Sequence, residues 1–264
     1  MKEITLVKLG GAAAADADAL ASLARELTPD NGVPPVLVHG GGATVSSWSR
    51  RLGTEPRFEN GVRMTTAEEM DVVEMVLAGL VNTQVVRVLC AQQHRAVGLS
   101  LSDCCMVTGI PVAAGGTNRT ARPGAVRTGL ITHLVSAGYT PVVNSVGTME
   151  DGGPCNINAD EAALALARAL GASRLVFLSD VPGVMIDGVV QNRMGSQDVA
   201  QAIADGHISG GMIPKVQSAL EATAHGVGNV IIGRYETAGD FTALVAGTAG
   251  TSLQSRPHEA GEDI

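Results

Sequence analysis

The sequence predicts an α/β protein with an open, mainly parallel sheet sandwiched between helices. Apolar strand-like runs alternate with helical periodicity along the whole 264-residue chain, which is typical of such sheets. Two of these runs lead straight into glycine loops, Lys8-Leu9-Gly10-Gly11 and His39-Gly40-Gly41-Gly42. Glycine lets backbone N–H groups approach an anion, and the strand ends of a parallel sheet share one edge. We therefore expect a site for a small, highly charged ligand at that edge, within one domain or between two lobes around a cleft.

The N-terminal part of the chain alternates short apolar runs with amphipathic stretches. Thr66 and Glu69 have the spacing of a capping box that opens one of the helices. A segment rich in Gly and Pro, 109–124, is expected to form hairpins or a long loop. The predicted strands cover 4–7 and 33–39, and the predicted helices include 20–27, 45–52, 66–77 and 80–89.

The C-terminal part repeats the same alternation. An alanine-rich stretch over 160–170 has high helix propensity, and the tail after Arg256 is polar. Strands are expected over 140–143, 174–178 and 230–232, with a short apolar pair at 189–190, and helices over 199–204 and within 209–224.

Composition excludes several classes of partner. The formal net charge is −8, whereas a protein that binds nucleic acid needs a basic face. The four cysteines show no C-x-x-C spacing, so we expect reduced thiols and no metal site. We also expect no signal peptide, no apolar run of membrane-spanning length and no membrane partner, which makes the cytoplasm the expected location.

Three further segments place polar residues at the ends of elements, and each has an ordinary structural explanation. Asp160 stands at the start of the alanine-rich helix, where it could be the N-cap, and Asn156 precedes it. Residues 179–184 follow a strand and are typical of a β-turn. Lys215 follows Pro214 in the first turn of a helix, where the macrodipole disfavours a cation. A phosphate shared by Lys215 and the helix N–H groups would remove this conflict.

Taken together, these motifs resemble those of the amino-acid kinase family. Within it, the chain is similar to the branch that transfers a phosphoryl group from ATP to the side-chain carboxylate of N-acetyl-L-glutamate in arginine biosynthesis. The resemblance implies a single kinase domain over 1–264, with a lobe at about 1–172 for the acyl amino acid and dimerisation and a lobe at about 173–264 for ATP. It extends from residue 4 to about 251 and rests on VKLGG, VLVHGGG, ENGVRMTTAEEMDVVEMVLAGLVN, NINADEAALALARALGA, LSDVPGV and GGMIPKV.

The resemblance also implies a role for each matching residue. Lys8 and Lys215 would neutralise the transferring phosphoryl group, with Asp160 between them and the N–H groups of Gly11 and Gly41 donating to its oxygens. The acyl amino acid would bind to Gly41, Gly42, Asn156 and Arg63, with Arg63 forked onto its α-carboxylate. The ATP site would be lined by Ser179, Asp180, Val181, Pro182, Gly183, Val184, His207, Ile208 and Ser209.

This allocation agrees with the chemistry of the reaction. A substrate side-chain carboxylate is already ionised at neutral pH, since its reference pKa is about 4.3, so no general base is required. The reaction needs alignment of two anions and stabilisation of charge along an in-line path. We expect Mg²⁺ to be held by the ATP phosphates, with no dedicated protein ligands.

The chain departs from many family members after the run 96–100. Where they carry a Gly-Lys-Asp step, it has Leu101-Ser102-Asp103, so a lysine contact to nucleotide or product is absent or comes from elsewhere. It also begins directly at the first strand, without the additional N-terminal helix of hexameric, arginine-inhibited relatives. We therefore expect a homodimer that is insensitive to arginine.

Three other functions were weighed against this interpretation. A sister kinase acting on a carrier-linked aminoadipate or glutamate is compatible with the same motifs. A non-catalytic amino-acid sensor would not need Lys8, Asp160 and Lys215 together. A dinucleotide-dependent oxidoreductase is disfavoured, because neither G-x-G-x-x-G nor the P-loop pattern follows these strands.

Overall fold

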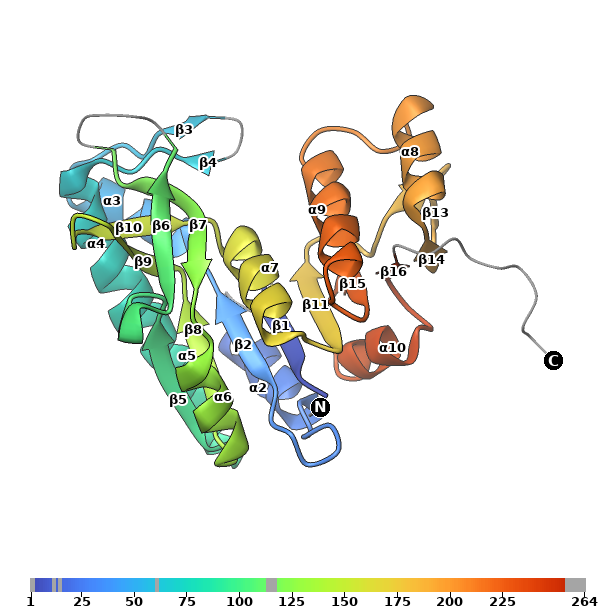
Figure 1. Ribbon diagram of the computed structural model, residues 1–264, viewed down its shortest axis with the longest axis horizontal. Coiled ribbons are helices and arrows are strands. Elements are labelled where there is room, and N and C mark those ends of the chain that lie inside the picture. The colour runs from blue at the N-terminus through green and yellow to red at the C-terminus, as the bar shows by residue number, and fades with distance from the viewer. Residues whose placement is uncertain (1–2, 11–12, 14–15, 60–61, 113–117, 255–264) are drawn as a thin grey trace.

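One eight-stranded sheet runs through the whole protein (Figure 1). The computed structural model describes residues 3–10, 13, 16–59, 62–112 and 118–254. Every neighbouring pair of strands is parallel except β15 and β16, so the predicted mainly parallel sheet is confirmed. The strand order is β14 (Arg193–Met194), β16 (Thr251–Leu253), β15 (Val230–Arg234), β11 (Arg174–Ser179), β1 (Thr5–Leu9), β2 (Val36–His39), β8 (Thr140–Asn144) and β5 (Ala96–Ser100).

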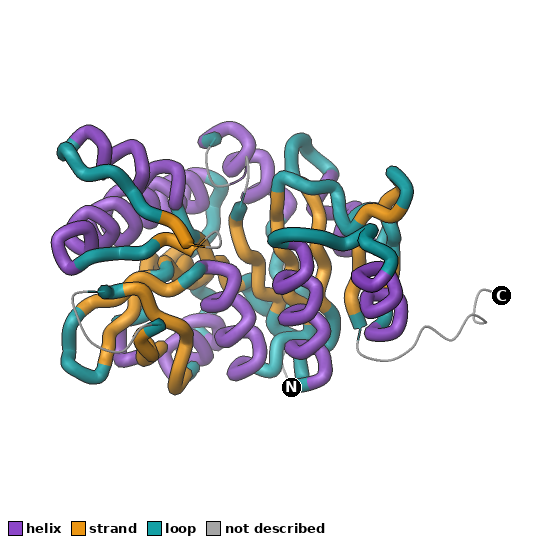
Figure 2. Tube along the Cα trace, turned by 90° about the horizontal axis from the view of Figure 1, so that it is seen from above, coloured by secondary structure: helices purple, strands orange, loops and turns teal. Residues whose placement is uncertain are grey.

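Helices cover both faces of this sheet, and Figure 2 shows them on either side of the central strands. Because successive side chains of a strand point to opposite faces, Leu6 packs with the core on one face and Val7 with the core on the other. The first face is covered by α6 (Gly129–Ser136), α7 (Ala159–Leu170), α8 (Ser196–Ala204) and α9 (Met212–Ala224). The second is covered by α2 (Ala17–Glu26), α3 (Gly42–Arg51), α4 (Ala67–Glu74), α5 (Asn82–Ala91) and α10 (Asp240–Ala246).

The predicted helices 66–77 and 80–89 are one continuous helix. A π-helical segment, Met75–Val81, joins α4 to α5, so helical structure runs from Ala67 to Ala91. By length and composition alone this 25-residue helix is apolar enough to span a membrane, contrary to the sequence-based expectation. In the fold, its Met70, Leu77 and Leu89 are buried in the core against the sheet.

For the Gly- and Pro-rich segment, hairpins or a long loop were expected, and β6 and β7 form a hairpin. This hairpin belongs to a small barrel that was not predicted. The barrel is closed by β10 (Pro154–Ile157), β7 (Thr120–Val126), β6 (Val107–Pro111) and β9 (Val146–Met149). Figure 1 shows it above β8, where β10 leads into α7. The remaining elements are a 3₁₀ turn, Asp103–Cys105, and the hairpins β3 (Phe58–Glu59) with β4 (Val62–Arg63) and β12 (Met185–Ile186) with β13 (Val189–Val190).

Candidate functional site

A cavity of about 260 Å³ opens at the carboxyl ends of β1 and β2. This is the edge at which the two glycine loops were expected to meet. Its walls come from seven separated parts of the chain, which the fold brings together. Gly11 lies outside the described residues. Six of the predicted site residues line the cavity, namely Lys8, Gly41, Gly42, Arg63, Asn156 and Asp160.

Two lysines converge on one carboxylate beside this cavity. Lys8 Nζ lies 2.8 Å from Asp160 Oδ1, and Lys215 Nζ lies 3.3 Å from Asp160 Oδ2. The N-cap of α7 is Asn158, whose side chain accepts from the N–H groups of Asp160 and Glu161. The alternative that Asp160 itself is the N-cap is therefore wrong, and its carboxylate is left to bridge the two ammonium groups.

The bridge fixes the charge of Asp160. Burial by itself would raise the pKa of this carboxyl, but the ammonium groups of Lys8 and Lys215 outweigh it and hold the pKa below its usual value. Asp160 is therefore ionised at neutral pH, and it partly neutralises two cations that would otherwise repel each other.

The use of lysine here is selective. Only three of the eighteen cationic side chains in the sequence are lysines, Lys2, Lys8 and Lys215, and two of these meet at Asp160. Lysine presents a compact point charge, whereas arginine presents a planar fork. A compact charge suits a position that must face Asp160 and a second anion in the cavity.

The N-terminal ends of two helices, α3 and α7, line the cavity and add positive potential to it. Helix α3 begins at Gly42, its N-cap is Gly41, and its first turn holds no acidic residue. A Cβ at Gly41 would lie 2.8 Å from Leu77 Cδ2, in the π-helical segment, so a larger residue here would force the buried Leu77 side chain to shift. Unpaired N–H groups at a helix N-terminus bind anions.

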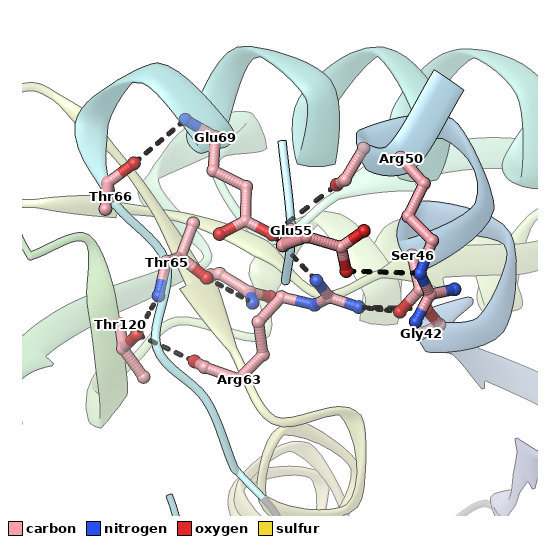
Figure 3. A network of polar contacts seen from close by, with 11 residues as sticks. Gly42, Ser46, Arg50, Glu55, Arg63, Thr65, Thr66, Glu69 and Thr120 are labelled. Carbon is pink, nitrogen blue, oxygen red and sulfur yellow. Dashed lines mark hydrogen bonds and ion pairs between the residues drawn. The ribbon is translucent and has the colours of Figure 1, made fainter. Parts of the chain in front are cut away.

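Arg63 is held on the opposite wall by three acceptors (Figure 3). Its Nη1 donates to Glu69 Oε1 at 2.7 Å, and its Nη2 donates to Gly42 O at 3.0 Å and to the Ser46 hydroxyl. Arg63 and Glu69 are both buried. Because both hydrogens of Nη2 are engaged, a fork onto a ligand carboxylate would have to replace one of these contacts, and that predicted role stays a prediction.

Glu69 has a role that the capping-box pattern did not reveal. Thr66 Oγ1 accepts from the Glu69 N–H at 3.2 Å, as the pattern predicts. The Glu69 carboxylate, however, pairs with Arg63 and does not turn back to cap the helix. Pairing with Arg63 is more favourable than capping the helix, because an arginine buried without a counterion costs far more free energy than an uncapped N–H.

Asn156 reaches the cavity from β10. Its Nδ2 donates to Thr65 Oγ1 at 2.9 Å, and Thr120 Oγ1 links the same wall by accepting from the Thr65 N–H and donating to the Arg63 carbonyl. Asn156 therefore lies in the barrel wall of the cavity, and its contact with a ligand stays a prediction.

The residues predicted for ATP are not among those that line this cavity. Val184 and Ile208 are buried in the core, and their backbone N–H groups donate to Thr251 Oγ1 and the Ala202 carbonyl oxygen. His207 contacts Asp187, with 3.5 Å between Nδ1 and Oδ1, and lines a separate cavity beside α8. The Asp180 carbonyl accepts from Arg234 Nε at 3.0 Å. The ATP assignment of 179–184 and 207–209 stays a prediction.

His39 is fully buried beneath the glycine loop, a feature that the sequence did not reveal. Its Nδ1 lies 2.7 Å from the Gly40 carbonyl oxygen, and its Nε2 lies 2.9 Å from Asn82 Nδ2. Burial lowers the pKa of His39 to about 4, so the ring is neutral at physiological pH.

The buried ring predicts a specific pH dependence of stability. Between pH 6.5 and about 4 the unfolded chain binds a proton at His39 that the folded protein does not. The free energy of unfolding should therefore fall as pH falls through this window, by up to about 1.4 kcal/mol per pH unit from this group. Urea unfolding at pH 7, 6 and 5 should show a shallower decline for His39→Gln than for the wild type. Equal declines in the free energy of unfolding for the wild type and His39→Gln would contradict a lowered pKa of His39.

Comparison with known proteins assigns the chain to a family. The model of the amino acid kinase family matches residues 3–234, and the chain belongs to that family. It is 41% identical over 245 residues to the acetylglutamate kinase of Symbiobacterium thermophilum, covering 86% of this chain and 82% of that protein. It is 39% identical over 237 residues to the acetylglutamate kinase of Prochlorococcus marinus, covering 87% and 77%. The structure of smu.665 from Streptococcus mutans UA159 superposes with a TM-score of 0.78 at 26% identity, covering 97% of this chain and 100% of that one.

Proposed function

We propose that the protein transfers the γ-phosphoryl group of ATP to the side-chain carboxylate of N-acetyl-L-glutamate. The observation that carries this function is the pair of lysines bridged by Asp160 at the mouth of a cavity lined by a glycine loop, a helix N-terminus and Arg63. Several relatives at about 40% identity over most of the chain carry the name acetylglutamate kinase, which supports this substrate.

The site supplies alignment and charge stabilisation. A carboxylate oxygen of the acyl amino acid attacks the γ-phosphorus while the bond from phosphorus to the leaving oxygen of ADP breaks, giving an acyl phosphate. Lys8 and Lys215 neutralise the phosphoryl oxygens, Asp160 positions both ammonium groups, and the N–H groups of Gly11 and Gly41 donate to the same oxygens. Gly41, Gly42, Asn156 and Arg63 hold the acyl amino acid.

We propose that Mg²⁺ enters with ATP on its phosphates, where it neutralises charge on the oxygens. Among the described residues there is no group of three or more His, Cys, Asp and Glu side chains that could hold a metal ion. Asp160, the cavity's acidic side chain, is already engaged by two lysines. The protein residues therefore fit a metal brought by the nucleotide, and the nucleotide itself is assigned to 179–184 and 207–209.

The test of the substrate is a coupled assay of ADP release with N-acetyl-L-glutamate, glutamate, aspartate and N-acetyl-aminoadipate. We expect turnover with N-acetyl-L-glutamate and trapping of its acyl phosphate by hydroxylamine. Preference for N-acetyl-aminoadipate would instead indicate the sister kinase. Absence of turnover with every carboxylate would contradict a kinase function and favour a sensor.

We also propose that the protein is a cytoplasmic homodimer. Met75 and Leu80 are exposed on the long helix, and a second copy of the chain would cover them in a homodimer. The homodimer would use the lobe at about 1–172, and ATP the lobe at about 173–264. Light scattering that gives a hexamer would contradict the dimer, and inhibition by arginine would contradict the expected insensitivity. A cytoplasmic location agrees with the free cysteines Cys90, Cys104, Cys105 and Cys155.

A further inference from the structure

We propose that His39 and Asn82 are positioning residues that direct the backbone N–H of Gly41 into the cavity. The proposal rests on the function proposed above, because the phosphoryl group is what this N–H would serve. The residues that line the cavity include Gly40, Gly41 and Gly42 but neither His39 nor Asn82, which lie buried behind the loop. The pair therefore acts on the site through one peptide unit.

The contacts of Asn82 determine which ring nitrogen of His39 carries the proton. Asn82 Nδ2 lies 2.9 Å from the Val142 carbonyl oxygen and 2.9 Å from His39 Nε2. A backbone carbonyl can only accept, so the amide nitrogen must face Val142, and this fixes the orientation of the amide. The second hydrogen of the same nitrogen points to Nε2. Nε2 is therefore the acceptor, and the single proton of the neutral ring is on Nδ1.

The protonated Nδ1 then fixes the peptide between Gly40 and Gly41. It donates to the Gly40 carbonyl oxygen at 2.7 Å. In a planar trans peptide the carbonyl oxygen and the following N–H point in opposite directions. Holding the Gly40 oxygen against His39 therefore directs the Gly41 N–H away from the ring and towards the cavity. Among the described residues, none accepts a hydrogen bond from this N–H.

The surroundings of Asn82 show that the fold makes room for this arrangement. A Cβ at Gly98, in the edge strand β5, would collide with Asn82 Oδ1. His39 is fully buried and Asn82 is 5% exposed. Burying two polar side chains is costly unless both are hydrogen-bonded, and an apolar pair would fill the same space. The hydrogen bonds of His39 and Asn82 to each other and to the Gly40 and Val142 carbonyl oxygens instead fix the orientation of the loop.

Two variants of His39 separate positioning from simple packing. Asparagine places its amide nitrogen near the Nδ1 position and keeps the donor to Gly40, whereas glutamine reaches Asn82 and leaves the Gly40 oxygen without its donor. In the ADP-release assay with N-acetyl-L-glutamate, we expect His39→Gln to lower kcat by about 10²-fold, the scale for a misplaced reacting group. The KM values of both substrates should change little, and His39→Asn should recover most of the lost kcat.

The proposal is overturned if His39→Gln keeps the wild-type kcat, or if both variants lose the same amount. Wild-type protein without turnover on any carboxylate would instead overturn the proposed function, and the spectroscopic test below would still report on the pair.

Nitrogen-15 NMR of the wild-type protein tests the geometry even if both variants fail to fold. We expect a neutral His39 with Nδ1 protonated and Nε2 unprotonated, and a coupling across the hydrogen bond between Nε2 and Asn82 Nδ2. The remote variant Gly98→Ala should remove that coupling and lower kcat without touching the cavity. An Nε2-protonated ring in the wild type, or full activity of Gly98→Ala without the coupling, would overturn the proposal.

Discussion

Replacing Lys215 by alanine is expected to lower kcat by about 10²–10³-fold, the typical cost of losing one preorganised charge at a reacting group. The ammonium group lies 3.3 Å from Asp160 Oδ2, and Lys215 is not among the residues that line the acyl-amino-acid cavity. KM for N-acetyl-L-glutamate should therefore change far less than kcat. Lys8 does line the cavity, but its ammonium group is held by Asp160 at 2.8 Å, so Lys8→Ala should also lower kcat more than it weakens binding of the acyl amino acid. Steady-state kinetics would measure kcat and KM, and isothermal titration would measure the affinity for N-acetyl-L-glutamate.

Matched variants make this result specific. Arg168 of α7 forms an exposed ion pair with Glu221 of α9. Arg168→Ala should leave kcat near the wild-type value, because surface ion pairs contribute little to stability. Lys215→Arg should remain impaired, since a planar fork does not reproduce a compact charge. Loss of binding as large as the loss of kcat in Lys215→Ala would contradict a role in phosphoryl transfer.

Replacing Asp160 by asparagine is expected to lower kcat by about 10²-fold. The variant removes the carboxylate that holds Lys8 at 2.8 Å and Lys215 at 3.3 Å, so two ammonium groups are left facing each other. Without the carboxylate between them, the two ammonium groups repel each other and are no longer held where they can stabilise the transferring group. Steady-state kinetics of the wild type and the variant measure the loss of kcat.

A folding control completes this second experiment. Loss of the Asp160 negative charge can also perturb folding, so circular dichroism and thermal unfolding should accompany the kinetics. A folded Asp160→Asn variant that keeps the wild-type kcat would contradict the proposed role of Asp160.

Much of the fold follows from local patterns. The apolar runs that become β1, β2, β8, β11 and β15 are short and flanked by glycine, proline or charged residues, so their strand character is visible without knowledge of their neighbours. The barrel of β6, β7, β9 and β10 was missed for the opposite reason. Its closure depends on pairing between strands far apart in the chain, and glycine-rich strands carry little alternation.

The continuity of the long helix was also hidden from the sequence. The sequence pattern predicts two helices, 66–77 and 80–89, whereas the structure joins them through the π-helical segment. That local change of winding places Leu77 and Val81 against Gly41, so the irregularity contributes to the wall of the site.

The sequence by itself determined which residue types meet at the site. Lys8, the glycine loops, Asp160 and Lys215 stand at the ends of predicted elements, and parallel strands put such ends on one edge. The tertiary structure decided the partners: Asn158 as the N-cap that frees Asp160, Glu69 as the counterion of Arg63, and Asn82 as the residue that sets the tautomer of His39. A hydrogen bond depends on distance and direction in space. The order of residues alone therefore does not settle the partner, whether it lies two residues away, as for Asn158 and Asp160, or several elements away, as for Asn82 and His39.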